Sequence, residues 1–176
     1  MESTKVSPVK SALNYGTLLG IIMMILSMIV FIFEWYEATW MTVLSYIVLI
    51  AGIVYGIKRH RDLERGGIIS YGGALGYGTL IGLFVGIIGA LMLYIYLGYI
   101  DDSFIYFNLE KQEMQFYERG MADEQIEQAM AMSEKFSTPG IYAFAGAFMN
   151  TLTAFIISLI AAAFLKKEAE HFDDAV

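Results

Sequence analysis

The stretch GGIISYGGALGYGTLIGLFVGIIGALMLYIYLGYI (residues 66–100) decides the fold, because its 35 residues include no charged side chain. An apolar helix needs about 20 residues to cross the hydrocarbon core of a bilayer. The stretch is longer than one crossing requires and too short for two crossings joined by a turn. We therefore expect one long, tilted helix over residues 70–100, preceded by a glycine-containing turn.

Three further uncharged stretches predict membrane helices over residues 11–33, 38–57 and 138–165. The last of them starts at Thr138-Pro139, where a hydroxyl side chain can cap the helix and proline takes its first position. In the whole chain 57% of the residues are hydrophobic and 16% are charged, whereas soluble domains contain about 25% charged residues. The sequence therefore predicts an all-α polytopic membrane protein, with four transmembrane helices in one membrane domain over residues 1–176.

The lysines and arginines divide unequally between the two ends of the predicted bundle. Three lie between the third and fourth spans, and eight lie on the side of the two termini. Because positively charged segments stay in the cytoplasm, we expect both termini to be cytoplasmic and the segment over 101–137 to be outside. The net charge of −7 argues against nucleic acid as a partner. The eight residues are Lys5, Lys10, Lys58, Arg59, Arg61, Arg65, Lys166 and Lys167.

Small residues recur at every fourth position of the third predicted span, which places them along one face of a helix. Membrane helices associate through such faces because small side chains let two backbones approach closely. The first two spans each carry a pair of glycines with the same spacing. An alternative is a groove or hinge through which something small passes. The predicted helix-packing residues are Ala74, Gly78, Gly82, Gly86, Ala90, Gly16, Gly20, Gly52 and Gly56.

Three polar side chains stand out within the predicted spans: Asn14, Asn150 and Thr151. An asparagine in hydrocarbon needs hydrogen-bond partners, so we expect Asn150, near mid-depth, to face another helix, either to hold the bundle together or to contact a substrate. No Asp, Glu, Lys, Arg or His lies within the four spans. Proton-driven transporters use such groups inside the membrane, so a transporter of this class is disfavoured.

The segment over 101–137 is predicted to form an outer helical hairpin. Residues 103–118 and 123–136 both show apolar side chains at helical spacing, and Gly120 lies between them as a helix end. The hairpin would lie against the outer surface or over the mouth of the bundle. Its acidic, amphipathic surface favours binding of a partner. Other hypotheses are binding of a divalent cation by its carboxylates, or of copper by Met114, Met121, Met130 and Met132.

The loop between the second and third spans is basic, and Lys58, Arg59, Arg61 and Arg65 are predicted to contact anionic lipid headgroups. The glycines that follow are not part of a phosphate-binding loop, because no GK[ST] sequence is present. The two histidines, at positions 60 and 171, are far apart, and the chain has no cysteine. We therefore predict no catalytic residue, no metal site and no cofactor.

Three segments carry a resemblance to a known family. They are the stretch from Arg61 to Leu75, the hairpin with Glu118-Arg119-Gly120, and Thr138-Pro139-Gly140. Their order resembles that of a family of four-span bacterial inner-membrane proteins classed as a domain of unknown function. The resemblance covers nearly the whole chain and implies a multi-pass location in the bacterial inner membrane. It implies no activity and no role for any single residue.

The sequence favours a non-enzymatic integral membrane protein that serves as an assembly, scaffold or accessory component of the cell envelope. Its partners would be the lipid bilayer and either a second copy of itself or another membrane protein. Two alternatives stay open: a small-solute or lipid transport module, and an accessory subunit of a membrane enzyme such as an envelope glycosyltransferase.

Overall fold

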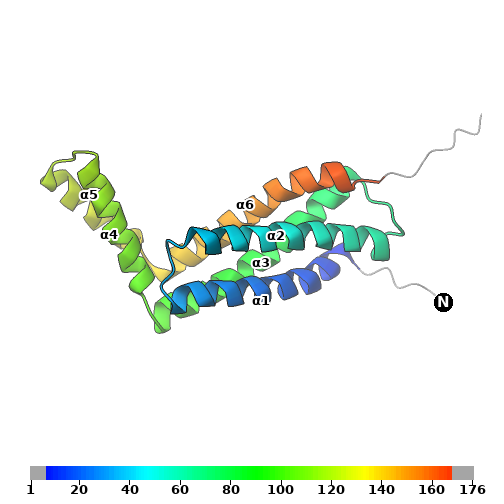
Figure 1. Cartoon of the computed structure of the whole chain (residues 1–176), viewed down its shortest axis with the longest axis horizontal. Coiled ribbons are helices and arrows are strands. Elements are labelled where there is room, and N and C mark those ends of the chain that lie inside the picture. Colours follow the sequence, from blue (N-terminus) through cyan, green and yellow to red (C-terminus); the bar gives the residue numbers. More distant parts are fainter. Residues whose placement is uncertain (1–6, 168–176) are drawn as a thin grey trace, which may run out of the picture.

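A computed structural model of the protein describes residues 7–167, which contain six α-helices and one short π-helix (Figure 1). Lys5 and His171 lie outside the described residues. Four of the helices, α1, α2, α3 and α6, are long and apolar enough to cross a membrane. The predicted all-α architecture is thus confirmed. The elements are α1 (Pro8–Ile32), α2 (Thr39–Arg59), η1 (His60–Glu64), α3 (Tyr71–Tyr99), α4 (Ser103–Glu118), α5 (Asp123–Phe136) and α6 (Pro139–Leu165).

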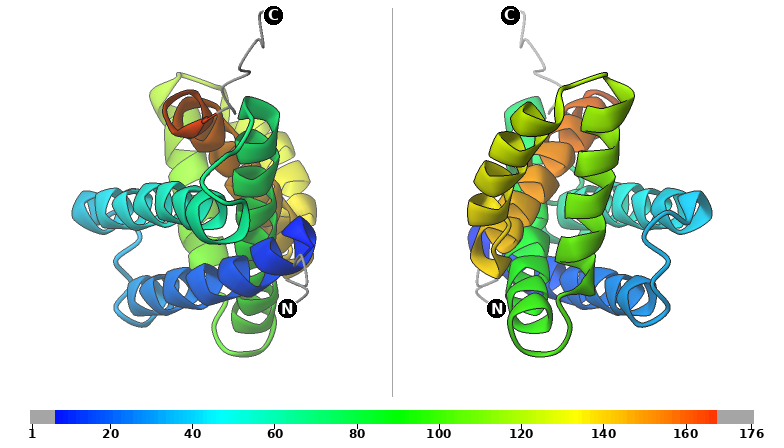
Figure 2. Two further views of the ribbon diagram at one scale, coloured as in Figure 1. Left: turned by 90° about the vertical axis from the view of Figure 1, so that its right-hand side faces the viewer. Right: turned by 90° about the vertical axis from the view of Figure 1, so that its left-hand side faces the viewer.

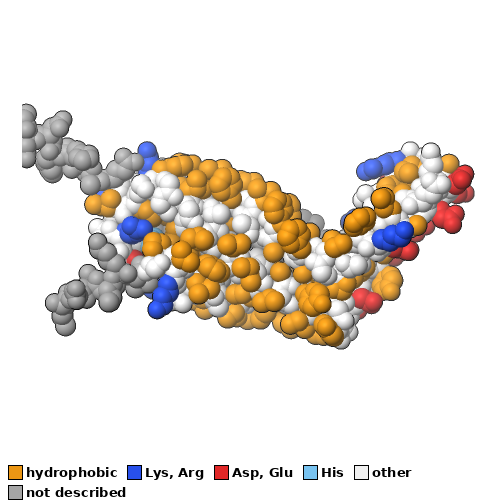
Figure 3. Space-filling model, turned by 180° about the vertical axis from the view of Figure 1, so that it is seen from behind, with side chains coloured by type: hydrophobic (Ala, Val, Ile, Leu, Met, Phe, Trp, Pro, Cys, Tyr) orange, Lys and Arg blue, Asp and Glu red, His pale blue; other side chains and the backbone are white. Residues whose placement is uncertain are grey.

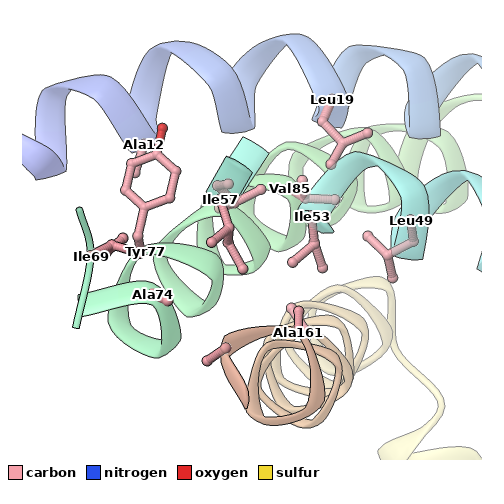
Figure 4. Close-up of a cluster of buried hydrophobic side chains, with 13 residues drawn as sticks. Ala12, Leu19, Leu49, Ile53, Ile57, Ile69, Ala74, Tyr77, Val85 and Ala161 are labelled. Carbon is pink, nitrogen blue, oxygen red and sulfur yellow. The ribbon is translucent and has the colours of Figure 1, made fainter. Parts of the chain in front are cut away.

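Helix α3 lies at the centre of the bundle, where α6 packs along one side of it and α1 along another (Figures 1 and 2). Helix α2 contacts all three. Their buried faces meet in one apolar core, in which Ile53, Ile57 and Ile81 are fully buried (Figure 4). Leucine, isoleucine, valine and tyrosine side chains fill this core together with five alanines, and glycines at the helix contacts bring the backbones close together. The bundle is therefore held by close packing, as expected for helices surrounded by lipid.

The outer surface of the bundle is apolar over its length. Figure 3 shows hydrophobic side chains spread over the visible face of the bundle, with lysine and arginine near one end and, on the hairpin at the other, aspartate and glutamate together with further lysine and arginine. Large side chains point away from the core: Leu18 is 58% exposed and Phe164 is 83% exposed. A soluble protein rarely exposes such a large continuous apolar surface. The surface fits a location within a membrane.

Hydroxyl side chains mark the beginning of two of the long helices. The Ser70 Oγ accepts a hydrogen bond from the Gly73 amide at 3.2 Å, and the Thr138 Oγ1 accepts one from the Ile141 amide at 3.4 Å. Each bond satisfies one of the amides that a helix leaves unpaired at its start. In α6 the next residue is Pro139, whose missing amide costs nothing at the first helical position.

Helices α4 and α5 form a hairpin that rises from the end of the bundle at a steep angle and extends beyond it (Figures 1 and 3). Its base is fixed by an aromatic cluster in which Phe31 packs on Tyr96 and Phe104, with ring centroids 4.9 and 5.2 Å apart. An ion pair of 2.7 Å between Lys111 and Glu37 adds a second attachment. The rings of Tyr36 and Tyr142 also pack on Phe104, and beyond this base the hairpin extends away from the bundle (Figure 1).

Candidate functional site

The small-residue face of α3 lies against α6 in the same chain. Gly82 lies against Ala154, and Gly78 against Ser158. A Cβ atom built at Gly86 would come within 2.9 Å of the Ala147 carbonyl oxygen. Ala74 is fully buried on the same face, and Ala90 is partly buried. The space that a passage along these residues would need is therefore occupied by α6.

The paired glycines of the first two helices also lie at close contacts. Gly16 and Gly20 face α3, where an added Cβ would meet the side chains of Phe84 and Ile88 at less than 3 Å. Gly52 faces Leu19, and Gly56 faces the Tyr15 ring and Ile81. These contacts hold the second half of α2 against α1 and α3, at the end of the bundle away from the hairpin.

A cavity lies between α2 and α6 toward the hairpin end of the bundle. Figure 2 shows α1 and α2 leading away to one side of α3 and α6. The cavity has a volume of about 390 Å³ and is lined by residues of α1, α2, α6 and the α1–α2 turn. We call it the α2/α6 groove. Its lining residues are Met23, Val30, Trp35, Tyr36, Met41, Thr42, Ser45, Tyr46, Leu49, Gly146, Met149, Asn150 and Thr153.

Among the polar side chains that line the α2/α6 groove are Ser45 from α2, and Asn150 and Thr153 from α6. All three are half-buried. In the described part of the chain, no hydrogen bond joins any of them to another residue, whereas the neighbouring Thr151 hydroxyl donates to the Ala147 carbonyl at 2.8 Å. The groove thus presents unpaired donors and acceptors to whatever fills it.

The three polar residues predicted within the spans have different surroundings. Asn150 lines the α2/α6 groove. Thr151 faces Gly86 of α3 and its hydroxyl is satisfied within its own helix. Asn14 is exposed near the opposite end of α1. Only Asn150 among them lies where a ligand could reach it from the groove.

A buried polar cluster lies at the other end of the bundle. It joins Ser11 of α1, His60 and Glu64 of η1, and Tyr77 of α3. The Glu64 carboxylate accepts from the Ser11 hydroxyl at 2.8 Å and lies 2.9 Å from the His60 Nδ1. The His60 and Tyr77 rings stack with centroids 3.8 Å apart. His60 is only 2% exposed.

This cluster was not predicted from the sequence, although the His60–Glu64 spacing of four residues is compatible with a contact along a helix. A serine nucleophile requires a base within hydrogen-bond reach of its hydroxyl. Here both Ser11 and His60 bond to the Glu64 carboxylate rather than to each other. Glu64 is thus the group within reach of the Ser11 hydroxyl, and the arrangement ties α1, η1 and α3 together.

The basic residues beside the cluster also contact the protein. The Arg59 Nη1 lies 3.6 Å from the Glu64 carboxylate, and the Arg65 Nε donates to the His60 Nε2 at 3.4 Å. Arg61 donates to the Leu165 carbonyl at 3.1 Å and pairs with Asp62. Lys58 is exposed. Arg61 therefore connects the α2–α3 loop to the end of α6.

Two clefts lie along the hairpin, and both are acidic. A cavity of about 820 Å³ between the hairpin and the bundle end is lined by Asp102, Glu110, Glu113 and Glu134 together with apolar residues. A second cavity, of about 630 Å³ between α4 and α5, shares Glu113 and Glu134 and adds Asp123 and Glu127. We call them the hairpin clefts. Within residues 7–167, no group of three or more His, Cys, Asp or Glu side chains is arranged to hold a metal ion.

Comparison with sequence models of known families matches nearly the whole chain. The sequence model of a family described as a protein of unknown function (DUF4199) matches residues 14–167. The match extends from the first turns of α1 to the last described residue after α6. No curated protein and no solved structure matches the chain.

Proposed function

Because the chain belongs to the DUF4199 family, whose function is unknown, we propose its role from its own surfaces. We propose that it is a non-enzymatic component of the bacterial inner membrane that docks a basic, amphipathic partner of the cell envelope on its hairpin. The membership confirms the resemblance to a domain of unknown function. The hairpin carboxylates support the proposed partner, and the basic α2–α3 loop supports the proposed orientation.

The carboxylates of the hairpin clefts carry this proposal. Glu113 and Glu134 line both clefts, beside the apolar side chain of Met130. The one ion pair found for the described hairpin residues joins Lys111 to Glu37, and it leaves these carboxylates without a cationic partner. Complementary charge steers a partner and fixes its register, while methionine adapts to apolar surfaces of varied shape. A basic segment with one apolar face fits this combination.

The proposed orientation places the hairpin on the periplasmic side of the membrane. The basic residues of the α2–α3 loop lie at the opposite end of the bundle, on the same side as the described chain ends at Ser7 and Lys167 (Figure 1). Basic loops favour the cytoplasmic side. In this orientation the hairpin clefts face the periplasm, where a partner anchored in the same membrane or in the envelope can reach them.

Charge reversal within the clefts tests the proposal. We expect the double variant Glu113→Lys/Glu134→Lys to lose cross-linked partners that the wild-type protein retains from native membranes at low salt. Wild-type binding should also weaken as salt rises, since exposed charges are screened within about 10 Å at 0.1 M. Glu124→Lys is the matched control, because Glu124 is exposed on α5 but lines neither cleft. An unchanged set of partners in the double variant would refute docking at the clefts.

The α2/α6 groove favours a second candidate function, a small-solute or lipid transport module. The groove reaches from the hairpin end to Asn150 in the middle of α6. Transport would appear as saturable uptake by reconstituted vesicles. The third hypothesis, an accessory subunit of a membrane enzyme such as an envelope glycosyltransferase, is distinguished by the identity of the partner that co-purifies.

A further inference from the structure

The inner end of the α2/α6 groove, at Asn150, lies at a depth that the polar groups of ordinary phospholipids do not reach. Asn150 is the twelfth residue of α6, which begins at Pro139. At 1.5 Å per residue it lies about 17 Å from the start of the helix, near the middle of a hydrocarbon core of about 30 Å. Ser45 and Thr153 line the same groove. Their hydrogen-bonding groups are therefore surrounded by hydrocarbon unless a ligand satisfies them.

The groove opens on the side of the bundle that faces lipid. Thr42 and Tyr46 along α2, and Met149 along α6, line it and are exposed. A ligand can therefore enter sideways from the bilayer without crossing the headgroup layer. The half-buried amide of Asn150 makes a purely hydrocarbon-filled groove unfavourable, because a polar group in hydrocarbon without a hydrogen-bond partner is costly.

The lining specifies the chemistry of the occupant. The described residues that line the groove include no Asp, Glu, Lys, Arg or His, so a charged group at the depth of Asn150 would be left without a counterion. Met23, Met41 and Leu49 supply adaptable apolar walls. An amide and two hydroxyls both donate and accept hydrogen bonds. The matching molecule has apolar chains and a small uncharged head that carries hydroxyl and carbonyl groups.

We propose that the α2/α6 groove binds an uncharged glycerolipid of the diacylglycerol class. The hydroxyl and ester carbonyls of this lipid hydrogen-bond to Asn150, Ser45 and Thr153, and its acyl chains lie along the methionine and leucine side chains. A phospholipid does not satisfy these groups, because its charged headgroup holds its ester groups near the membrane surface. The site is separate from the hairpin clefts and does not depend on what they bind.

Photolabelling of the full-length protein tests this site. The protein is reconstituted in phosphatidylcholine vesicles that contain a trace of a diacylglycerol with a photoactivatable group, and a photoactivatable phosphatidylglycerol serves as the charged probe. We expect the diacylglycerol probe to label peptides of α2 and α6 saturably, and unlabelled diacylglycerol to compete. Asn150→Leu should reduce the saturable labelling at least threefold. Asn14→Leu is the matched control, since Asn14 is exposed outside the groove, and it should label as the wild-type protein does.

Other results would overturn the proposal. Labelling that does not saturate, or that is equal for the phosphatidylglycerol probe, would mean that the groove holds only bulk lipid. Unchanged labelling of Asn150→Leu would mean that the amide does not select the ligand. If Asn150→Leu does not fold, Ser45→Leu provides the same test, because it fills the groove from α2 and should also reduce labelling. Glu113→Lys/Glu134→Lys should keep full labelling. A failure of the proposed docking at the hairpin clefts is thereby distinguished from a failure of the proposed lipid binding in the groove.

Discussion

At the scale of single residues, hydrogen positions in the buried polar cluster follow from what each group can donate. A carboxylate only accepts, so the Ser11 hydroxyl gives its one hydrogen to Glu64. The Tyr77 hydroxyl, 2.9 Å from the Ser11 Oγ, must then donate to Ser11. The His60 Nδ1 donates to the second oxygen of Glu64, while its Nε2 accepts from Arg65. Two series of hydrogen bonds therefore meet at Glu64, one from Tyr77 through Ser11 and one from Arg65 through His60.

These hydrogen bonds predict the effects of two substitutions of Tyr77. Tyr77→Phe removes the bond to Ser11 but keeps the ring that stacks on His60, so we expect unfolding in detergent to become easier by about 1 kcal/mol. Tyr77→Leu also removes the stacking and should lower the melting temperature further. Thermal unfolding of the purified protein checks the order. Equal melting temperatures for wild type and Tyr77→Phe would show that the bond to Ser11 does not stabilise the bundle.

Sequence reasoning could not find this cluster because its members come from distant segments. His60 appears isolated along the chain, since Ser11 and Tyr77, the cluster members from other helices, lie 49 and 17 residues away from it. Only Glu64 is near it, and a π-helix rather than an α-helix carries both residues. By contrast, the sequence alone singles out Asn150, because an amide in the middle of an apolar span requires a hydrogen-bond partner, and the structure places this residue in the lining of the α2/α6 groove.

At the scale of elements, we expect a glycine-to-leucine substitution to have different effects on the two faces of α3. Gly82 lies against Ala154, whereas a Cβ built at Gly89 meets nothing within 4 Å. Gly82→Leu should therefore force α3 and α6 apart and destabilise the bundle by about 1–3 kcal/mol, while the helix still inserts. Gly89→Leu is the matched control and should keep the wild-type melting temperature in detergent. If Gly82→Leu melted as the wild type does, close packing of α3 on α6 would be wrong.

The start of α4 is predicted to depend on pH through Asp101. The Ser103 hydroxyl and the Ser103 amide both donate to the Asp101 carboxylate, at 2.6 and 2.9 Å. These bonds hold the pKa of Asp101 below its ordinary value, which is about 3.9. A carboxylate with a lowered folded pKa stabilises the fold above its unfolded pKa, and this contribution is lost as pH falls through the folded value.

We therefore expect the first turn of α4 to be protected at neutral pH and to fray below about pH 4. Hydrogen-exchange protection factors of the amides at 103–105, measured against pH, check this. Asp101→Asn should remove the pH dependence, because the amide does not titrate. Asp102→Asn should preserve it, since the Asp102 side chain makes no hydrogen bond to the described residues around it. Loss of protection at the same pH in Asp101→Asn would assign the effect to another group.

The sequence predicts helices better than it predicts their packing. Each long apolar stretch can be identified by counting, because the bilayer sets a minimum length for a spanning helix. The α2/α6 groove could not be identified in this way, since it depends on how α1 and α2 are placed relative to α3 and α6. Gly52 and Gly56 let the second half of α2 pack closely, but nothing in the sequence states how far its first half stands from α6.

At the scale of the whole molecule, the basic and acidic side chains gather mainly at opposite ends of the bundle. The long apolar sides separate a basic end, with Arg59, Arg61 and Arg65, from an acidic hairpin (Figure 3). The positive-inside rule uses only the basic residues near the spans, so the hairpin's carboxylates add little to insertion. Their position at the far end fits the proposed docking of a basic partner. Both proposed sites, the hairpin clefts and the α2/α6 groove, lie toward this end.

The orientation of the chain can be tested directly because it contains no cysteine. Single cysteines replace Leu63 in η1, whose side chain is 72% exposed, and Gln128 in α5, which is also exposed. On intact spheroplasts an impermeant thiol reagent should label Gln128→Cys, and it should label Leu63→Cys only after permeabilisation. Labelling of Leu63→Cys alone before permeabilisation would invert the topology. The hairpin clefts would then face the cytoplasm, and the α2/α6 groove would draw its lipid from the inner leaflet.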